Sequence, residues 1–368
     1  MPNQCLSEFE QMLQQCQWQK AQSALETWRS QFPHEPQLKV LEARLAYSMG
    51  NASQAEAMFR EILRSATQAH ILAEARKGLK QIEEDAIRRR KQRAEEIASA
   101  GADQGLGFLA LLPVNPDNVS LRSKTVERLA RIMGTDIYTA KFKLPTRYLK
   151  IIRMGAIADL QSYGEALQQA EIPAVWISLK AISAIPLLEV KYFELLGLGE
   201  VRALHDQGDT RFTLAEVSAR VEGILPTYGN VFDIDAKHQI IRREQVLDRV
   251  RICDFHLPKH NLILRFHDSN YQFNQGMQIA INQPLAHVKP TVQQRWQTLL
   301  TWFADAMPHT RIHDDFSHFQ DMLKMYPDFL KEVTPRIVLF RPKPQLVDNC
   351  FEVYSATVFL IQQMGLSA

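Results

Sequence analysis

Six histidines lie in two short stretches of the sequence, and imidazole is a common metal ligand and proton carrier near neutral pH. The first stretch, D-F-H-L-P-K-H-N-L-I-L-R-F-H-D, holds His256, His260 and His267. Pro258 lies between the first two, so their imidazoles do not share one face of a continuous helix. The stretch also lacks the H-E-x-x-H pattern of metalloproteases. We therefore expect these three histidines to be structural.

The second stretch, H-T-R-I-H-D-D-F-S-H-F, places His309 and His313 four residues apart, as two ligands on one helix face would be. Adding Asp314 or Asp315 gives the three ligands that catalytic zinc needs, which makes a metal-dependent hydrolase one alternative. His318 is the third histidine of the stretch. However, a preceding proline favours a turn, and the aspartates suit a helix N-cap. We expect these side chains to point apart and assign no catalytic, metal or cofactor site.

Two basic stretches are candidates for binding an anionic partner. Residues 88–93, R-R-R-K-Q-R, follow acidic residues at helical spacing and contain no aromatic residue, which favours a solvated helix over a surface for base stacking. The stretch K-F-K-L-P-T-R-Y-L-K-I-I-R interleaves Phe142 and Tyr148 with its cations and is the better candidate for RNA. The candidate anion-binding cations are Arg88, Arg89, Arg90, Lys91, Lys141, Lys143, Arg147, Lys150 and Arg153.

Composition restricts the class of protein further. The 368 residues hold 43 Lys and Arg against 41 Asp and Glu, which is not the positive excess of a general nucleic-acid binder. The four cysteines are scattered and form no C-x-x-C, so they fit a reducing compartment. The N-terminus does not resemble a signal peptide, and no apolar run reaches the roughly 18 residues of a transmembrane helix. The sequence thus predicts a soluble, cytoplasmic protein.

The first hundred residues contain a repeat with a period of 34 residues, the length of a helix-turn-helix unit. On this pattern residues 2–68 resemble two tetratricopeptide repeats, with an unrelated four-helix array as the alternative. The resemblance implies that small residues lie where helices cross. Gly50 occupies the expected turn position of the second repeat, and Cys16 stands there in the first. The repeated packing residues are Ala21, Leu25, Trp28, Ala55, Phe59 and Ile62.

Hydrophobic periodicity places these residues on elements of a multidomain α+β protein. We expect a helical domain with a long charged helix in residues 1–100, a glycine-rich linker at 101–107, a small β-α-α-β-α-β unit at 108–185, and a β-rich domain with C-terminal helices at 186–368. Within the last domain the pattern predicts an antiparallel sheet, a turn at Y-G-N (228–230), a strand at 272–281, a helix over 314–331 and a strand at 336–340.

These features together predict a non-enzymatic adaptor, scaffold or assembly factor that binds a protein partner through its helical repeats without a cofactor. The joining of such repeats to an otherwise unmatched globular part resembles bacterial accessory proteins. An RNA-binding regulator that uses the basic stretches is the first alternative, and the metal-dependent hydrolase is the second. Self-association is left open.

Overall fold

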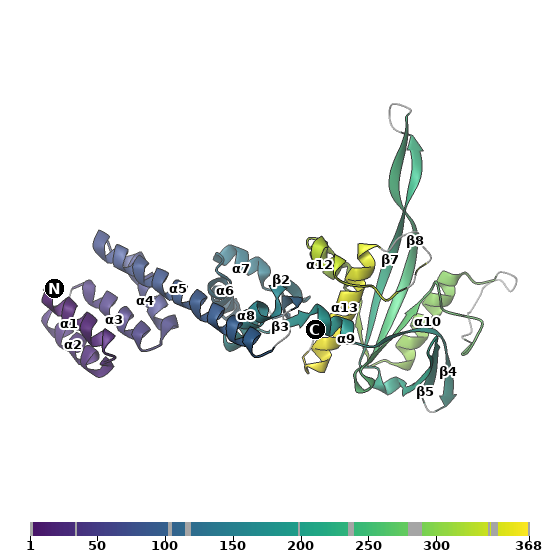
Figure 1. Cartoon of the computed structure of the whole chain (residues 1–368), viewed down its shortest axis with the longest axis horizontal. Helices are drawn as coiled ribbons and strands as arrows, with labels where there is room; N and C mark the ends of the chain where they lie inside the picture. Colours follow the sequence, from purple (N-terminus) through teal and green to yellow (C-terminus); the bar gives the residue numbers. More distant parts are fainter. Residues whose placement is uncertain are drawn as a thin grey trace. The chain divides into compact units, whose positions relative to one another are not determined.

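Helices form the N-terminal part of the chain, and helices and strands share the remainder (Figure 1). The computed structural model describes residues 3–33, 35–101, 105–114, 119–197, 199–234, 239–278, 289–337, 339 and 345–366. These residues divide into two compact units, Met1–Glu96 and Ile97–Ala368. The α+β class is confirmed. Residues on both sides of the boundary expected near residue 185 belong to the second unit, and part of the expected linker, 102–104, lies outside the described residues.

The first unit is built from helical hairpins. The helices are α1 (Asn3–Gln14), α2 (Trp18–Gln31), α3 (Gln37–Ser48), α4 (Ala52–Ser65) and the long α5 (Ala69–Ser99). Helix α3 begins and ends 34 residues after α1 (37 against 3, 48 against 14), and α4 does so after α2 (52 against 18, 65 against 31). The helices therefore recur with the period seen in the sequence.

The residues that repeat in the sequence fill the interior of this helical unit. Ala21 and Ala55 are both completely buried. Gly78 of α5 brings that helix close to α4, since a methyl group at this position would lie 2.4 Å from the Phe59 ring. The packing residues that are buried here are Ala21, Leu25, Trp28, Ala55, Phe59 and Ile62.

The second unit starts with a small antiparallel sheet of order β2-β1-β3. Its elements are β1 (Leu106–Leu111), α6 (Val119–Met133), α7 (Ile137–Lys143), β2 (Lys150–Ala156), α8 (Ile157–Gln169) and β3 (Ala174–Ser178). The predicted order of strands and helices in this part is confirmed. Leu109 and Leu111 pack with α6 and α8, whereas Phe108 and Ala110 belong to a core shared with the larger sheet.

The larger sheet has the order β10-β7-β8-β9-β4-β5-β6 among the described residues. The strands are β4 (Leu187–Gly197), β5 (Glu200–His205), β6 (Gly208–Thr213), β7 (Ala219–Ile234), β8 (Ile240–Leu257), β9 (Leu262–His267) and β10 (Arg311–His313), with short 3₁₀ turns η1 (Leu214–Glu216) and η2 (Pro258–His260). The fully antiparallel sheet expected from the sequence is wrong, because β4–β9 and β7–β10 are parallel. Both parallel pairs join strands far apart in the chain, where no hairpin fixes the direction.

The turn expected at residues 228–230 is also wrong, because β7 continues through it to Ile234. Gly229 pairs with Gln245 in β8, and a methyl group at Gly229 would lie 2.3 Å from the Leu247 side chain. The glycine thus allows a close approach within the ladder rather than a change of direction. In Figure 1 β7 and β8 project from the sheet as a two-stranded ribbon. The D-A-K-H turn, 235–238, lies outside the described residues.

Helices cover both faces of this sheet. Trp296 and Phe303 of α10 (Val292–Ala306) pack on one face, and α13 (Leu346–Gln363) fills the other together with α9 (Leu179–Ala184), α11 (Phe316–Leu323) and α12 (Pro327–Lys331). Within the described residues, no helix is both long and apolar enough to cross a membrane.

Three elements differ from the sequence prediction. The helix expected over 314–331 is interrupted before α12, where Pro327 starts a new helix. Residues 272–278 form turns rather than a strand, and 279–288 lie outside the described residues. Residues 336, 337 and 339 are not in a strand.

Candidate functional site

A pocket of 230 Å³ lies in the second unit between β10, the segment preceding β2, and α13. It brings together residues from two stretches that the sequence suggested separately. Arg147 comes from the second basic stretch, and His313, Asp314 and Asp315 come from the second histidine stretch. Tyr354 contributes from the buried helix α13.

His313 lies in β10, where pairing with Val221 of β7 fixes its backbone and only 6% of the residue is exposed. Burial, together with Arg311, lowers the pKa of this imidazole to about 4, so the ring is neutral at physiological pH. The Tyr354 hydroxyl donates a hydrogen bond to Asp315. Burial and this bond raise the pKa of Tyr354, which keeps the hydroxyl protonated.

The histidine stretch does not assemble as a metal site. His309 is exposed, and the His318 ring packs beside Tyr148 with 4.8 Å between ring centroids. Among the described residues, no three His, Cys, Asp or Glu side chains are arranged to hold a metal ion. The pocket therefore offers a neutral imidazole, guanidinium groups and carboxylates rather than a metal ligand set.

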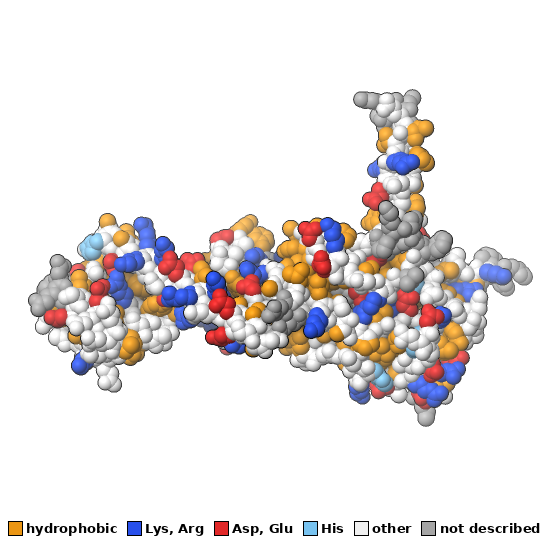
Figure 2. Space-filling view, in the orientation of Figure 1, with side chains coloured by type: hydrophobic (Ala, Val, Ile, Leu, Met, Phe, Trp, Pro, Cys, Tyr) orange, Lys and Arg blue, Asp and Glu red, His pale blue; other side chains and the backbone are white. Residues whose placement is uncertain are grey.

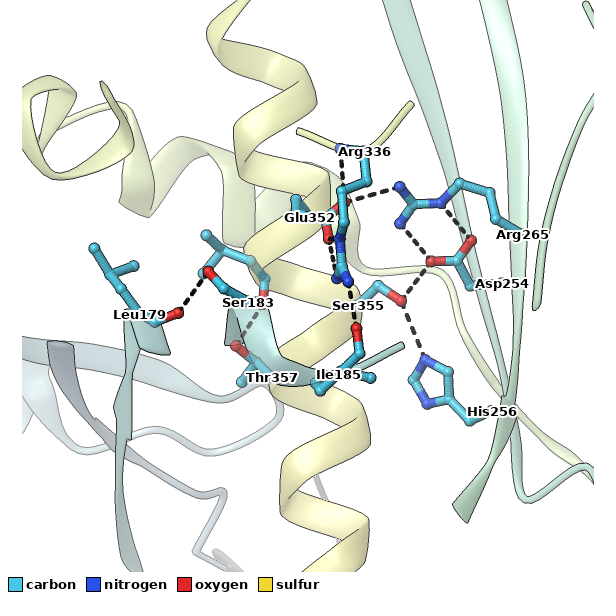
Figure 3. A network of polar contacts seen from close by, with 11 residues as sticks. Leu179, Ser183, Ile185, Asp254, His256, Arg265, Arg336, Glu352, Ser355 and Thr357 are labelled. Carbon is cyan, nitrogen blue, oxygen red and sulfur yellow. Dashed lines mark hydrogen bonds and ion pairs between the residues drawn. The ribbon is translucent and has the colours of Figure 1, made fainter. Parts of the chain in front are cut away.

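A buried polar network lies against the same helix, α13 (Figure 3). Arg265 of β9 donates to both oxygens of Asp254 in β8, at 2.8 and 2.7 Å. The same guanidinium donates to Glu352 of α13 at 2.9 Å, and Arg336 binds the other Glu352 oxygen at 2.7 Å. Two carboxylates and two guanidinium groups thus neutralise one another between the sheet and the helix.

The charged forms of this network are stabilised in spite of burial. Burial alone would raise the pKa of Glu352, but Arg265 and Arg336 outweigh it and lower that pKa below its ordinary value. Burial alone would lower the pKa of Arg265, and here Asp254 and Glu352 outweigh it and raise that pKa. Paired buried charges of this kind fix one geometry, and removing a single partner is costly.

Ser355, His256 and Asp254 have the residue types of a hydrolytic triad, but their spatial order differs. The Ser355 hydroxyl donates to Asp254 at 2.6 Å, so its oxygen accepts from Nε2 of His256 at 3.1 Å. In a triad the histidine lies between serine and carboxylate. All three residues are completely buried, and burial lowers the pKa of His256 to about 3. The arrangement joins α13 to β8.

The second basic stretch is divided among different environments. Arg153 donates to Asp159 at 3.1 Å and its guanidinium lies 4.4 Å from the Tyr163 ring. Lys150 donates to the carbonyl of Phe142 at 2.5 Å. Lys141 and Lys143 belong to α7, the helix that also carries the exposed Tyr138 and Phe142.

The first basic stretch lies on α5 and is partly engaged within that helix. Arg88 pairs with Asp85, and Nε of Arg89 donates to the Asp85 carbonyl at 3.3 Å. Arg90 is half-buried, whereas Lys91 is exposed. The binding of an anion by either stretch stays a prediction.

Sequence reasoning missed the buried network, although a signal was present. Asp254 and Arg265 interrupt otherwise apolar strands, I-C-D-F and L-I-L-R-F, and Glu352 interrupts the apolar helix C-F-E-V-Y. Charges at inward positions of buried elements need opposite charges nearby. The sequence therefore marked the participants, but not which of them pair.

Comparisons with known proteins give no relative: no family model matches the chain, and neither a curated protein nor a solved structure is significantly similar to it.

Proposed function

We propose that this chain is a non-enzymatic adaptor or assembly factor that binds a protein partner through its helical unit. The observation that carries the proposal is the 34-residue recurrence of both helix bounds and buried side chains across α1 to α4. This recurrence supports the resemblance to tetratricopeptide repeats. Stacked repeats of that kind form extended concave surfaces that bind other proteins.

One layer of the helical unit is the best candidate for the docking face. Arg44 of α3 donates to Glu10 of α1 at 2.9 Å and also pairs with Glu74 of α5. A single side chain thus links the three helices α1, α3 and α5. Tyr47 donates to Asp85 of α5, and burial together with this bond raises the pKa of Tyr47 to about 12. The resulting face carries charges of both signs and suits a polar protein segment of mixed charge.

Site-specific photo-crosslinking in the full chain tests this proposal. A photoreactive amino acid at Gln81, which is exposed on α5 and donates to Asp85 at 3.1 Å, should crosslink to a protein partner. The matched control is Lys39, an exposed residue of α3 whose ammonium lies 3.9 Å from Glu61 of α4. Because the Lys39 side chain reaches toward α4, which is not part of the docking layer, a photoreactive residue there should give no adduct. Equal crosslinking at both positions, or none at either, contradicts docking on the layer of α1, α3 and α5.

A specific surface on α7 favours RNA binding as a second candidate function. Tyr138 and Phe142 are 71% and 59% exposed, and their ring centroids lie 4.6 Å apart. Lys141 belongs to the same helix. Exposed aromatic rings beside cations are the arrangement on which single-stranded bases stack.

Electrophoretic shifts with single-stranded RNA test the second candidate. Tyr138→Ala should weaken binding by roughly 1–3 kcal/mol if a base stacks there, and binding should fall steeply with salt as counterions are released. Arg153→Ala is the control and should change little, because Asp159 and Tyr163 already hold that guanidinium. The absence of a shift at low salt excludes RNA and leaves the adaptor proposal intact.

A further inference from the structure

The ribbon of β7 and β8 continues well beyond the sheet that carries it. Strand β10 pairs with β7 only at 219–221, and β9 pairs with β8 only at 252–257. Residues 224–234 and 240–251, which pair with each other beyond both of these contacts, are here named the arm. Within the described part of the chain, no third strand pairs with the arm. Two strands alone are marginally stable in water, and an additional strand with an apolar face is the usual remedy.

The arm exposes large apolar side chains along its length. Phe232 is 73% exposed, Ile240 76% and Leu247 60%. Figure 2 shows both hydrophobic and charged side chains on the surface of the arm. An exposed apolar strand with an open edge is a template for pairing with another strand.

The backbone hydrogen bonds of β7 show which residues face the open edges. The Gln345 side chain accepts from the Tyr228 amide at 3.4 Å and donates to the Tyr228 carbonyl at 3.2 Å. Tyr228 therefore directs both backbone groups away from β8. In an antiparallel pair the opposite residue does the same, and the pattern repeats every second residue. Through the observed register, the outward residues of β8 are Ile240, Arg242, Glu244 and Val246.

The segment that holds these four residues is complementary to the same segment of a second copy when the two run antiparallel. When the β8 edges of two copies pair around a twofold axis at Arg243, Ile240 lies opposite Val246 of the other copy and Arg242 lies opposite Glu244. Each contact occurs twice. Opposite charges and apolar pairs directly across two strands are stabilising. At the axis Arg243 of one copy meets Arg243 of the other. Their mutual repulsion is reduced because each guanidinium lies 3.6 Å from Asp233 of its own arm.

We propose that a second copy of this chain binds the arm, with β8 pairing with β8 of the partner copy in this register. The two ribbons then form one four-stranded sheet, β7-β8-β8-β7, across the twofold axis. Phe232 and Ile240 lie on the same face of that sheet as Arg242, because Phe232 is directly opposite Arg242 and Ile240 lies two residues from it along β8. The interface is isologous, as is typical of twofold homodimers. This proposal goes beyond the adaptor function and does not depend on it.

Charge exchange tests the pairing in the full chain. Sedimentation equilibrium over a concentration series should show a dimer for the wild type. Glu244→Arg puts like charges opposite each other twice and should weaken dimerisation about tenfold or more. Arg242→Glu should do the same. The double variant, Arg242→Glu with Glu244→Arg, restores opposite charges and should recover the dimer.

The matched control is Glu127→Arg, the same chemical change at an exposed position of α6, and it should leave the dimer unchanged. All altered residues are exposed, so each variant should keep the wild-type circular dichroism spectrum. A wild type that stays monomeric at the highest concentration overturns the proposal. A double variant as weak as the single variants also overturns it.

Cysteine crosslinking tests the register directly. In a background with Cys5→Ser and Cys16→Ser, Arg243→Cys places two thiols at the axis. Non-hydrogen-bonded residues across antiparallel strands have Cα atoms about 4.5 Å apart, within disulfide range. Mild oxidation should therefore yield a linked dimer. Gln245→Cys is displaced from the axis and should remain unlinked. Linkage at 245 in place of 243, or at neither, contradicts the pairing.

Discussion

At the residue scale, the turns of the two helical hairpins both need a residue with a positive φ, but only the second turn has a glycine there. Cys16 has φ 55°, and Gly50, at the equivalent turn 34 residues later, has φ 88°. Only glycine adopts this left-handed region freely. Cys16→Gly should therefore raise the free energy of unfolding by about 1 kcal/mol. This value is the backbone strain that glycine relieves minus the conformational entropy that glycine adds to the unfolded chain. Urea unfolding of the full chain, followed in the helical transition, measures the change.

The complementary substitution provides the control at the second turn. In the part of the chain that the structure describes, no atom lies within 4 Å of the position that a Gly50 side chain would take, so Gly50→Ala tests the backbone angle alone. It should lower the free energy of unfolding by about 1 kcal/mol. A loss of stability in Cys16→Gly would mean that the thiol makes a contact more valuable than the relief of strain.

At the scale of elements, α13 depends on buried charges to fix its position against the sheet. Glu352 is 2% exposed and pairs with both Arg265 and Arg336. Glu352→Gln keeps the shape of the side chain but removes the negative charge that pairs with both guanidinium groups. Breaking a buried ion pair in this way costs roughly 3–5 kcal/mol. Chemical denaturation should show a loss of this size. Glu332→Gln, at an exposed position, should change stability by less than about 0.5 kcal/mol. Equal effects of the two variants would mean that the network contributes nothing.

Some of these elements could be predicted from the sequence and others could not. The helices of the first unit and the order β-α-α-β-α-β were predictable, because their periodicity is local. The direction of β9 beside β4 was not, because those strands pair across a long stretch of chain. The continuity of β7 through Gly229 was missed, since a glycine that admits Leu247 looks the same in sequence as a turn glycine. His313 was marked as a candidate, but its neutral, buried state depends on Val221 and α13.

At the scale of the whole molecule, acid should destabilise the second unit through two buried histidines. Burial lowers the pKa of His256 to about 3 and of His313 to about 4, from an ordinary value of 6.5. Between pH 6.5 and about 4 the unfolded chain thus binds protons that the folded chain does not. Stability therefore rises with pH in this window, and falls on acidification by up to about 1.4 kcal/mol per pH unit for each histidine. Below about pH 4.5 the lowered pKa of Glu352 adds a loss in the same direction.

Urea unfolding at about pH 7 and about pH 5 measures this dependence, since the two values lie on either side of the unfolded histidine pKa. The double variant His256→Gln with His313→Gln has side chains that do not titrate. It should be less stable than the wild type at both pH values, because Ser355 loses a well-placed donor and the sheet loses buried volume. The difference between the two pH values should, however, nearly vanish. A double variant that keeps the full pH dependence would place its origin in other groups, and the two imidazoles would then be accessible to protons in the folded chain.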